Sequence, residues 1–351
     1  MLLTILSFIA VLIVLVMVHE IGHFVTARAS GVKVEEFGLG FPPRLLSFKR
    51  GETLYSLNAI PLGGFVKMAG EEDPKIPGSL ASKGTAVRIM VLAAGSLMNA
   101  LLPVLLFSIA FMVPHDVVIG EVQVRGTVYP SPAMAAGIEV GDVLLEVDGR
   151  PLSSAHELRR YLQLKRGEEI DILVRHDDGV TETVSLTPRW RHAPGRGATG
   201  IVPEDINYEI LSQSYPFWEA IPMGVVKCVE TFTLFKNAII SMVIGIEPVV
   251  LTGPVGIAQI TGEAAQAGLS PLLEFAAFFS INLAIINIFP LPALDGGRIA
   301  FVLLEWIRRG RRVSPKVEGY IHMAGFFMLM AAFAAITYQD IWRIIAGESL
   351  F

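Results

Sequence analysis

The sequence predicts a polytopic α-helical membrane protein with four transmembrane helices, an inserted α/β domain and a membrane-associated β-hairpin. Apolar residues make up 52% of the 351 residues and charged residues only 17%, against about 25% in a typical soluble domain. The apolar residues gather in four long runs, whereas the stretch 114–214 has an ordinary soluble composition. The net charge of −5 gives no basic footprint for nucleic acid, so we expect no nucleic-acid partner.

The first predicted transmembrane helix covers residues 2–27, where His19, Glu20 and His23 are the only ionisable side chains. About 20 apolar residues suffice to cross a hydrocarbon core of about 30 Å. No Lys or Arg precedes Arg28, which argues against a cleaved signal peptide. Three further spans are predicted over residues 89–113, 272–289 and 320–337.

The basic residues predict the orientation of these spans. The loop 28–88 holds nine basic residues (Lys and Arg) and six acidic residues (Asp and Glu). The loop 296–319 holds six basic and two acidic residues. The stretch 114–270 instead holds twelve basic and twenty acidic residues. Short loops rich in Lys and Arg face the cytoplasm, so we expect a multi-pass protein of the cell (inner) membrane with its long insert outside.

The segment 217–246 is apolar overall, but Lys227, Glu230 and Lys236 lie inside it. Each charge at the centre of a transmembrane helix would cost about 2.5–3.5 kcal/mol. We therefore predict an amphipathic helix at the membrane interface. Four spans then remain, in agreement with the distribution of charge.

A metal-binding pattern lies in the first predicted span, as His19-Glu20-Ile21-Gly22-His23. Histidines four residues apart share one face of a helix, so both imidazoles can bind one zinc ion. Glu20 then stands next to the metal as a general base. Two histidines at a polar helix end would be the ordinary alternative, but ionisable groups inside an apolar span are rare and usually functional.

Asp295 is the candidate third ligand. A span whose one charged residue, Glu274, lies near its start ends in Pro290 and Pro292, which interrupt a helix, and Gly296 and Gly297 follow the aspartate. Broken backbone at membrane depth is tolerated where it lines a cavity or is buried in protein. If residues 217–246 do not cross the membrane, Asp295 lies at the same depth as the two histidines. The alternative is a turn at the membrane exit followed by a cytoplasmic aspartate.

Three sequence patterns resemble the site-2 proteases, which are intramembrane zinc metalloproteases, and in particular the RseP-like subgroup. They are HEIGH, the run NIFPLPALDGG at residues 287–297, and AGSLMN at residues 94–99. The resemblance implies Zn²⁺ as the cofactor and single-pass membrane proteins as substrates, for example an anti-sigma factor or a remnant signal peptide. It also implies site residues: zinc ligands His19, His23 and Asp295, catalytic Glu20, and Asn287, Asn282 and Asn99 for binding the substrate backbone or orienting the site.

The insert, residues 114–190, resembles a PDZ domain, and it is a single one where some family members have two. Strands are expected at 117–124, 170–175 and 181–186, and a helix at 154–165. A PDZ fold binds extended peptides by strand addition. Two roles stay open, a peptide receptor or a filter that excludes bulky ectodomains. A linker and the interfacial helix are expected to fill residues 191–270, between the transmembrane regions 1–113 and 271–351.

The predicted hairpin, residues 32–68, pairs strands 32–40 and 53–68. It either caps the helices or offers a free strand edge, with Tyr55 and Leu57, to an unwound substrate. Two other functions compete with proteolysis: a membrane-anchored PDZ scaffold with an inactive metal site, and a metal-ion transporter. His322 is expected to be an ordinary helix-end residue.

Overall fold

The structure, a computed structural model, describes residues 1–71, 73–191, 197–246 and 252–346. The chain forms two compact units. The helical unit combines Met1–Ala110 with Leu251–Phe351, and the second unit is the inserted segment Phe111–Val250. The metal-binding motif and Asp295 both belong to the helical unit.

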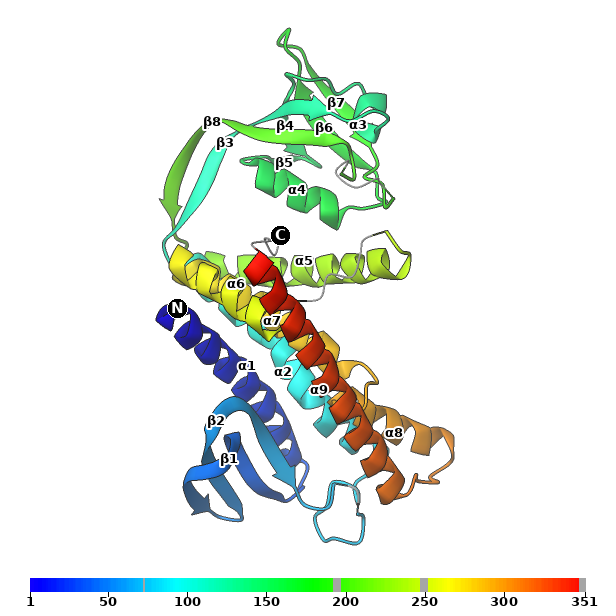
Figure 1. The fold of residues 1–351 in the computed structure, drawn as a ribbon. Helices are drawn as coiled ribbons and strands as arrows, with labels where there is room; N and C mark the ends of the chain where they lie inside the picture. The colour runs from blue at the N-terminus through cyan, green and yellow to red at the C-terminus, as the bar shows by residue number, and fades with distance from the viewer. Residues whose placement is uncertain (72, 192–196, 247–251, 347–351) are drawn as a thin grey trace. The chain divides into compact units, whose positions relative to one another are not determined.

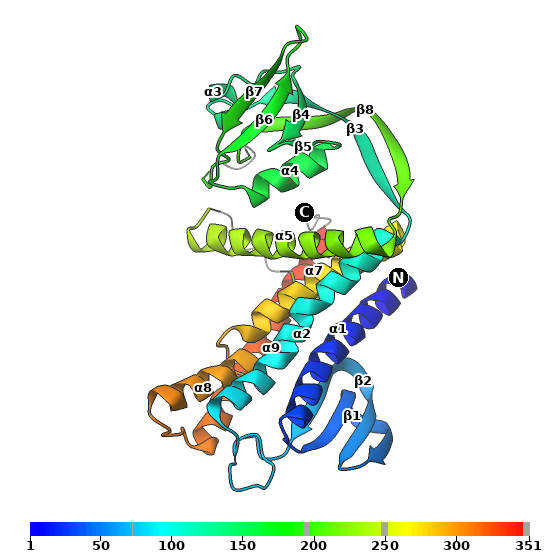
Figure 2. The ribbon, with the colours of Figure 1, turned by 180° about the vertical axis from the view of Figure 1, so that it is seen from behind.

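Four helices of the helical unit are long and apolar enough to cross a membrane, as the sequence predicts. They are α1 (Leu2–Ala29), α2 (Thr85–Met112), α7 (Leu269–Ile288) and α9 (Pro315–Ala346). Figures 1 and 2 show α2 running alongside α1 and α7. Gly22 of α1 lies so close to the carbonyl of Ala94 on α2 that no side chain fits between them. Small residues of this kind let two helix backbones approach closely.

Two shorter helices lie in segments that the sequence analysis leaves as loops. Helix α6 (Pro254–Ala267) packs against α1, where Gly262 contacts Thr4. Helix α8 (Asp295–Ile307) starts at the aspartate of the predicted site. The buried residues of α6 are Gly256, Thr261 and Gly262. These residue types have weak helix propensity, so tertiary packing rather than local pattern stabilises this helix.

The predicted hairpin is formed by β1 (Val34–Arg50) and β2 (Thr53–Met68). Both strands change register several times, and the first half of β1 pairs on both of its sides. Phe37, for example, lies opposite Val66 on one side and opposite Tyr55 on the other. The result is a four-segment sheet made from only two strands.

The free edges of this sheet differ from those expected. Tyr55 pairs with both Phe37 and Phe48, and Leu57 pairs with both Leu39 and Leu46. The prediction that Tyr55 and Leu57 offer a free edge is therefore wrong, because each bend in β1 brings a second partner to them. The edges are instead the outer half of β1 and the segment Gly64–Met68 of β2.

A small apolar core joins the hairpin to the helices. It lies where the last turn of α1 meets β1, β2, α2 and α8, and it holds Phe24 and Ile299 among its partly buried members. Its buried residues are Ala27, Val32, Val34, Val66, Met68, Leu80, Val91, Leu92 and Val302. This core fixes the hairpin beside the histidines of α1.

The inserted unit contains a sheet in the order β7-β6-β4-β3-β8, with β5 (Arg150–Pro151) paired to β4. Helices α3 (Pro132–Ala135) and α4 (Ala155–Leu164) contribute Ala133, Leu158 and Leu162 to its core. The strands are β3 (His115–Thr127), β4 (Val143–Val147), β6 (Ile170–Arg175), β7 (Thr181–Leu186) and β8 (Ile201–Gln213). Strand β8 is unexpected, because it pairs along most of β3 inside the range predicted to hold a linker. Most of its side chains are at least partly exposed, so it lacks a strong apolar alternation.

Helix α5 (Phe217–Val243) covers the segment for which an amphipathic helix is predicted, and it is not among the four candidate spans. Its polar side chains contact α4. Glu230 pairs with Arg160, and the Asn237 amide donates to the carbonyls of Gln163 and Leu164 at 2.9 and 3.2 Å. The polar residues of α5 thus bind α4 within the inserted unit.

Candidate metal centre

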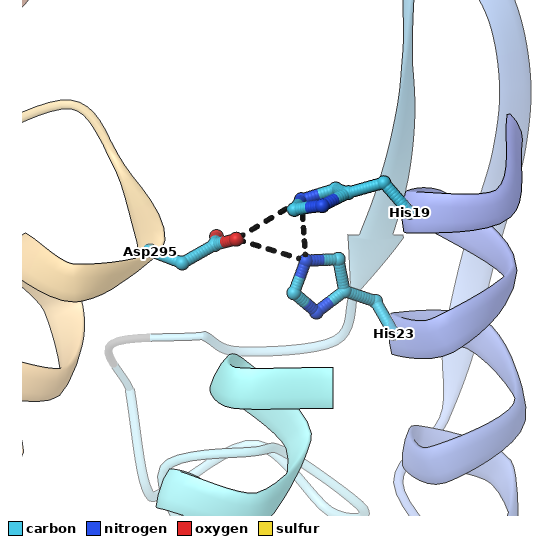
Figure 3. Close-up of side chains that lie close together, drawn as sticks. All are labelled: His19, His23 and Asp295. Carbon is cyan, nitrogen blue, oxygen red and sulfur yellow. Dashed lines mark hydrogen bonds and ion pairs between the residues drawn. The ribbon is translucent and has the colours of Figure 1, made fainter. Parts of the chain in front are cut away.

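Three ligand atoms from two distant parts of the chain meet at one point (Figure 3). His19 and His23 lie one turn apart on α1 and are 9% and 5% exposed. Their Nε2 atoms are 3.1 Å apart. Oδ2 of Asp295, the first residue of α8, lies 3.0 Å from Nε2 of His19 and 3.1 Å from Nε2 of His23.

This triangle fits a zinc ion. Ligand atoms at about 2.0–2.1 Å from a tetrahedral zinc are separated from one another by about 3.3 Å. The three separations of 3.0–3.1 Å are close to that value, and two imidazoles with one carboxylate form a donor set that zinc accepts. Three protein ligands also leave a fourth position for water or substrate. Among the described residues, this trio alone forms such a cluster.

The second ring nitrogen of each histidine is also held. Nδ1 of His23 lies 2.9 Å from the carbonyl oxygen of Val91, which can only accept, so Nδ1 carries the proton and Nε2 keeps its lone pair. Nδ1 of His19 lies 3.5 Å from the amide nitrogen of Asn99, and the buried amide oxygen of Asn99 has no partner in the part of the chain that the structure describes. With this amide turned by 180°, Oδ1 would accept from Nδ1–H of His19.

The two prolines and two glycines around Asp295 lie where the backbone breaks between two helices. Helix α7 ends at Ile288, and Leu294 is the N-cap of α8. The carbonyl of Phe289 folds back over Gly296, and the carbonyl of Leu291 folds back over Gly297, too closely for any Cβ. The two glycines therefore let the chain reverse sharply and direct Asp295 toward α1.

A cavity of about 490 Å³ opens beside the three ligands. Glu20 lines it, and so does the free edge of β2 from Gly64 to Met68. The Val66 backbone amide faces the Glu20 carboxylate. The cavity is thus bordered on one side by the metal ligands and on the other by a row of backbone groups.

An ion pair closes part of this cavity. Arg298 of α8 binds Glu71, and the other carboxylate oxygen of Glu71 accepts from the Met68 amide at 3.2 Å. Glu71 thus ties the end of the edge strand to the helix that carries Asp295. No sequence pattern marks Glu71 or Arg298 as site residues, because charges of this kind are ordinary in a predicted cytoplasmic loop.

The three asparagines suggested by resemblance fall in different places. Asn99 is 1% exposed and faces His19. Asn282 and Asn287 lie on α7 and are partly buried. Within the described ranges, neither hydrogen-bonds a metal ligand or Glu20, and neither lines the cavity.

Comparisons with known proteins agree with this geometry. The profile of peptidase family M50, the site-2 protease family, matches residues 7–332. The chain belongs to peptidase family M50. A Clostridium perfringens protein whose name describes it as a zinc metalloprotease is 36% identical over 334 residues, which cover 93% of this chain and 95% of that protein. The zinc metalloproteases RasP of Oceanobacillus iheyensis and Geobacillus kaustophilus are 29% and 28% identical, each over 97% of this chain.

This M50 peptidase is a zinc metalloprotease. The activity and the cofactor predicted from the sequence are confirmed, and so is the family. Its four apolar helices make it a membrane protein.

Proposed function

We propose that this M50 peptidase hydrolyses peptide bonds within or next to the transmembrane segments of single-pass membrane proteins. One observation carries the proposal: the convergence of His19, His23 and Asp295 at an apolar candidate span, beside a cavity bordered by a free strand edge. A soluble substrate would not require a metal site on such a helix. Anti-sigma factors and remnant signal peptides belong to this substrate class.

In this mechanism the two imidazoles and the Asp295 carboxylate hold zinc. When bound, zinc polarises the scissile carbonyl and lowers the pKa of the attacking water. Glu20 takes the proton from that water and delivers it to the departing amine. The Val66 amide orients the Glu20 carboxylate toward the cavity for both transfers. Asn99 holds His19 in the tautomer that leaves Nε2 free.

The edge strand Gly64–Met68 offers a way to hold the substrate. A peptide bond inside a helix is shielded by the hydrogen bonds of that helix, so the substrate must unwind before hydrolysis. Its exposed backbone groups then need partners, because an unpaired polar group in an apolar setting is costly. The edge of β2 supplies such groups next to Glu20. The substrate adds to the sheet as a further strand.

Apolar surfaces support contact of the hairpin and α5 with the bilayer. The bend and outer half of β1 expose four large apolar side chains, and α5 exposes apolar residues along its length while its polar side chains bind α4. The β1 residues are Phe41, Leu45, Leu46 and Phe48, and those of α5 include Trp218, Ile221, Val225 and Val229. Both elements fit an interfacial position. With basic short loops facing the cytoplasm, the metal centre lies near the cytoplasmic face of the inner membrane.

The inserted unit acts as a filter rather than a peptide receptor. A peptide that joins a PDZ-like sheet lies between its edge strand and a helix. Here Arg159 of α4 donates to the carbonyl of Pro203 on β8 at 3.0 Å, and Asp205 of β8 accepts from the Ala155 amide. These bonds cross the space that an added strand needs. A substrate with a folded ectodomain should therefore be cleaved more slowly than the same segment without it.

The proposal is tested with a transmembrane reporter substrate and a zinc assay on the same preparations. Glu20→Gln should abolish cleavage while zinc is retained, because it removes the base and no ligand. Asp295→Asn should weaken both cleavage and zinc binding. Full cleavage by either variant would reject the mechanism. Cleavage of a soluble peptide at the same rate as the membrane reporter would reject the substrate class.

A further inference from the structure

Helix α9 contacts the rest of the helical unit at few points. Of its residues Pro315–Ala346, only Gly325 and Asp340 are buried. Asp340 accepts hydrogen bonds from the amides of Gly253 and Gly256, at the start of α6. Gly325 packs on Pro292, so closely that a Cβ would overlap the proline ring and its carbonyl. One of the two anchors of α9 is therefore the backbone break that precedes Asp295.

His322, one turn before Gly325, binds the same break. Its Nδ1 atom accepts a hydrogen bond from the backbone amide of Ala293 at 2.9 Å. A backbone N–H can only donate, so Nδ1 is unprotonated and the ring proton lies on Nε2. The imidazole also contacts the ring of Phe301 on α8, with 5.5 Å between the ring centres.

Two features of this contact are unfavourable in free energy, which distinguishes it from ordinary packing. Nε2 of His322 is buried and has no hydrogen-bond partner among the described residues, and leaving a buried donor unpaired costs free energy. Ala293 has φ = +75°, in the left-handed region that disfavours residues with a side chain. Such strain persists only where surrounding contacts enforce it, and it gathers at functional sites. His322 holds the amide of Ala293, and Ala293 lies two residues before Asp295 in the chain.

We propose that His322 and Gly325 are positioning residues that hold the Pro290–Leu294 break on α9 and so fix Asp295 in reach of the metal. The inference rests on the proposed function only in taking Asp295 as a zinc ligand. His322 acts through the Ala293 backbone and touches neither metal nor substrate. The fourth candidate span thereby takes part in the metal centre without supplying a ligand.

Four variants of the full chain test this in detergent. His322→Ala removes the acceptor, and His322→Asn restores an acceptor oxygen near the place of Nδ1. Gly325→Ala pushes Pro292 away from α9. Met323→Ala is the matched control, because Met323 is 51% exposed on the same turn of the helix. Zinc affinity is measured against a competing chelator, the visible spectrum of the cobalt-substituted protein reports ligand geometry, and thermal unfolding is followed without metal.

We expect His322→Ala and Gly325→Ala to weaken zinc binding about tenfold and to alter the cobalt spectrum. His322→Asn and Met323→Ala should stay close to the wild type. Wild-type affinity and spectrum for His322→Ala would overturn the inference, and so would zinc binding by His322→Asn as weak as that of His322→Ala. If His322→Ala does not fold, wild-type zinc binding by Gly325→Ala overturns it instead.

Zinc affinity and cleavage of the wild type and of Asp295→Asn distinguish a failure of this inference from a failure of the proposed function. Unchanged zinc affinity in Asp295→Asn would contradict the ligand role of Asp295, and with it both proposals. Tight, Asp295-dependent zinc binding in a chain that does not cleave the membrane reporter would contradict the proposed function alone. In that case the comparison of the His322 variants with the wild type still tests this inference, because it measures zinc affinity and ligand geometry and not cleavage.

Discussion

The backbone of Gly95 on α2 lies directly against the imidazole of His23 on α1. A Cβ at Gly95 would lie 2.6 Å from Nε2 of His19 and closer still to Nε2 of His23. Neither ring can retreat, because His23 is held by the Val91 carbonyl and both rings are buried. The absence of a side chain at residue 95 therefore makes room for both imidazoles, the proposed zinc ligands.

Gly95→Ala should consequently weaken zinc binding by about 10–100-fold and lower cleavage in proportion. Gly319→Ala is the matched control, because Gly319 lies in α9 with no atom within 4 Å of its Cβ position. That variant should keep zinc affinity, and replacing a helical glycine by alanine adds about 0.5–1 kcal/mol of stability. Zinc titration of both variants checks the prediction, and equal affinities would refute it.

The contact between Asn99 and His19 predicts an effect on metal binding rather than on substrate binding. Asn99→Leu removes the acceptor for Nδ1–H of His19, so zinc affinity should fall about 10–100-fold. Asn99→Asp keeps an acceptor oxygen and should bind zinc nearly as the wild type does. If Asn99→Leu instead raises KM for the reporter with zinc affinity unchanged, Asn99 is a substrate-binding residue.

Val66 tests the role of the edge strand. Val66→Pro removes the amide that faces Glu20, whereas Val66→Ala shortens the side chain and keeps the amide. We expect Val66→Pro to lose at least 100-fold in cleavage while still binding zinc, since about 10²–10⁴-fold is the usual contribution of a positioned general base. Val66→Ala should lose far less. Similar losses in the two variants would show that the apolar core, and not the strand edge, is the cause.

The inserted unit should lose stability as the pH rises. Nδ1 of His176 donates to the buried carboxylate of Asp142 at 2.9 Å, and this hydrogen bond raises the pKa of His176 above its ordinary value of about 6.5. A raised folded-state pKa stabilises the fold fully below the unfolded-state value, and this stabilisation disappears as the pH passes the folded-state value.

Hydrogen exchange in the full chain measures this effect at the amides of β4 and β6. Strand β4 begins next to Asp142, and β6 ends next to His176. Protection should fall with rising pH above about 6.5, after correction for the intrinsic rate of exchange. His176→Gln should remove this dependence. The same pH dependence in that variant would assign it to another group.

Much of the metal centre follows from the sequence. The spacing of His19 and His23 places both on one helix face, and the position of Asp295 at the end of an apolar span predicts the same depth. Both inferences use local periodicity and the thickness of the membrane, which do not depend on how the helices pack. The interruption by Pro290 and Pro292 is also local, because proline lacks an amide hydrogen.

Contacts between elements were not predictable in the same way. Tyr55 was expected at a free edge, but the bends of β1 give it partners on both sides. Segments far apart in the chain also determine three further features: the pairing of β8, the helix α8, and the hydrogen bond from the Ala293 amide to His322. No spacing rule relates such residues, because register and docking are set by the complete fold.

The sequence by itself determined the class of protein and the metal, and it predicted two candidate ligands on one helix, since composition and helical periodicity are properties of neighbouring residues. It also marked Asp295, through the cost of a carboxylate at the end of an apolar span. Only the tertiary structure decided which residues serve those ligands: Gly95 by leaving space, Asn99 and Val91 by holding the ring nitrogens, and His322 by holding the backbone before Asp295. The physical reason is that a lone pair must point at the metal, and its direction is fixed by contacts from other helices.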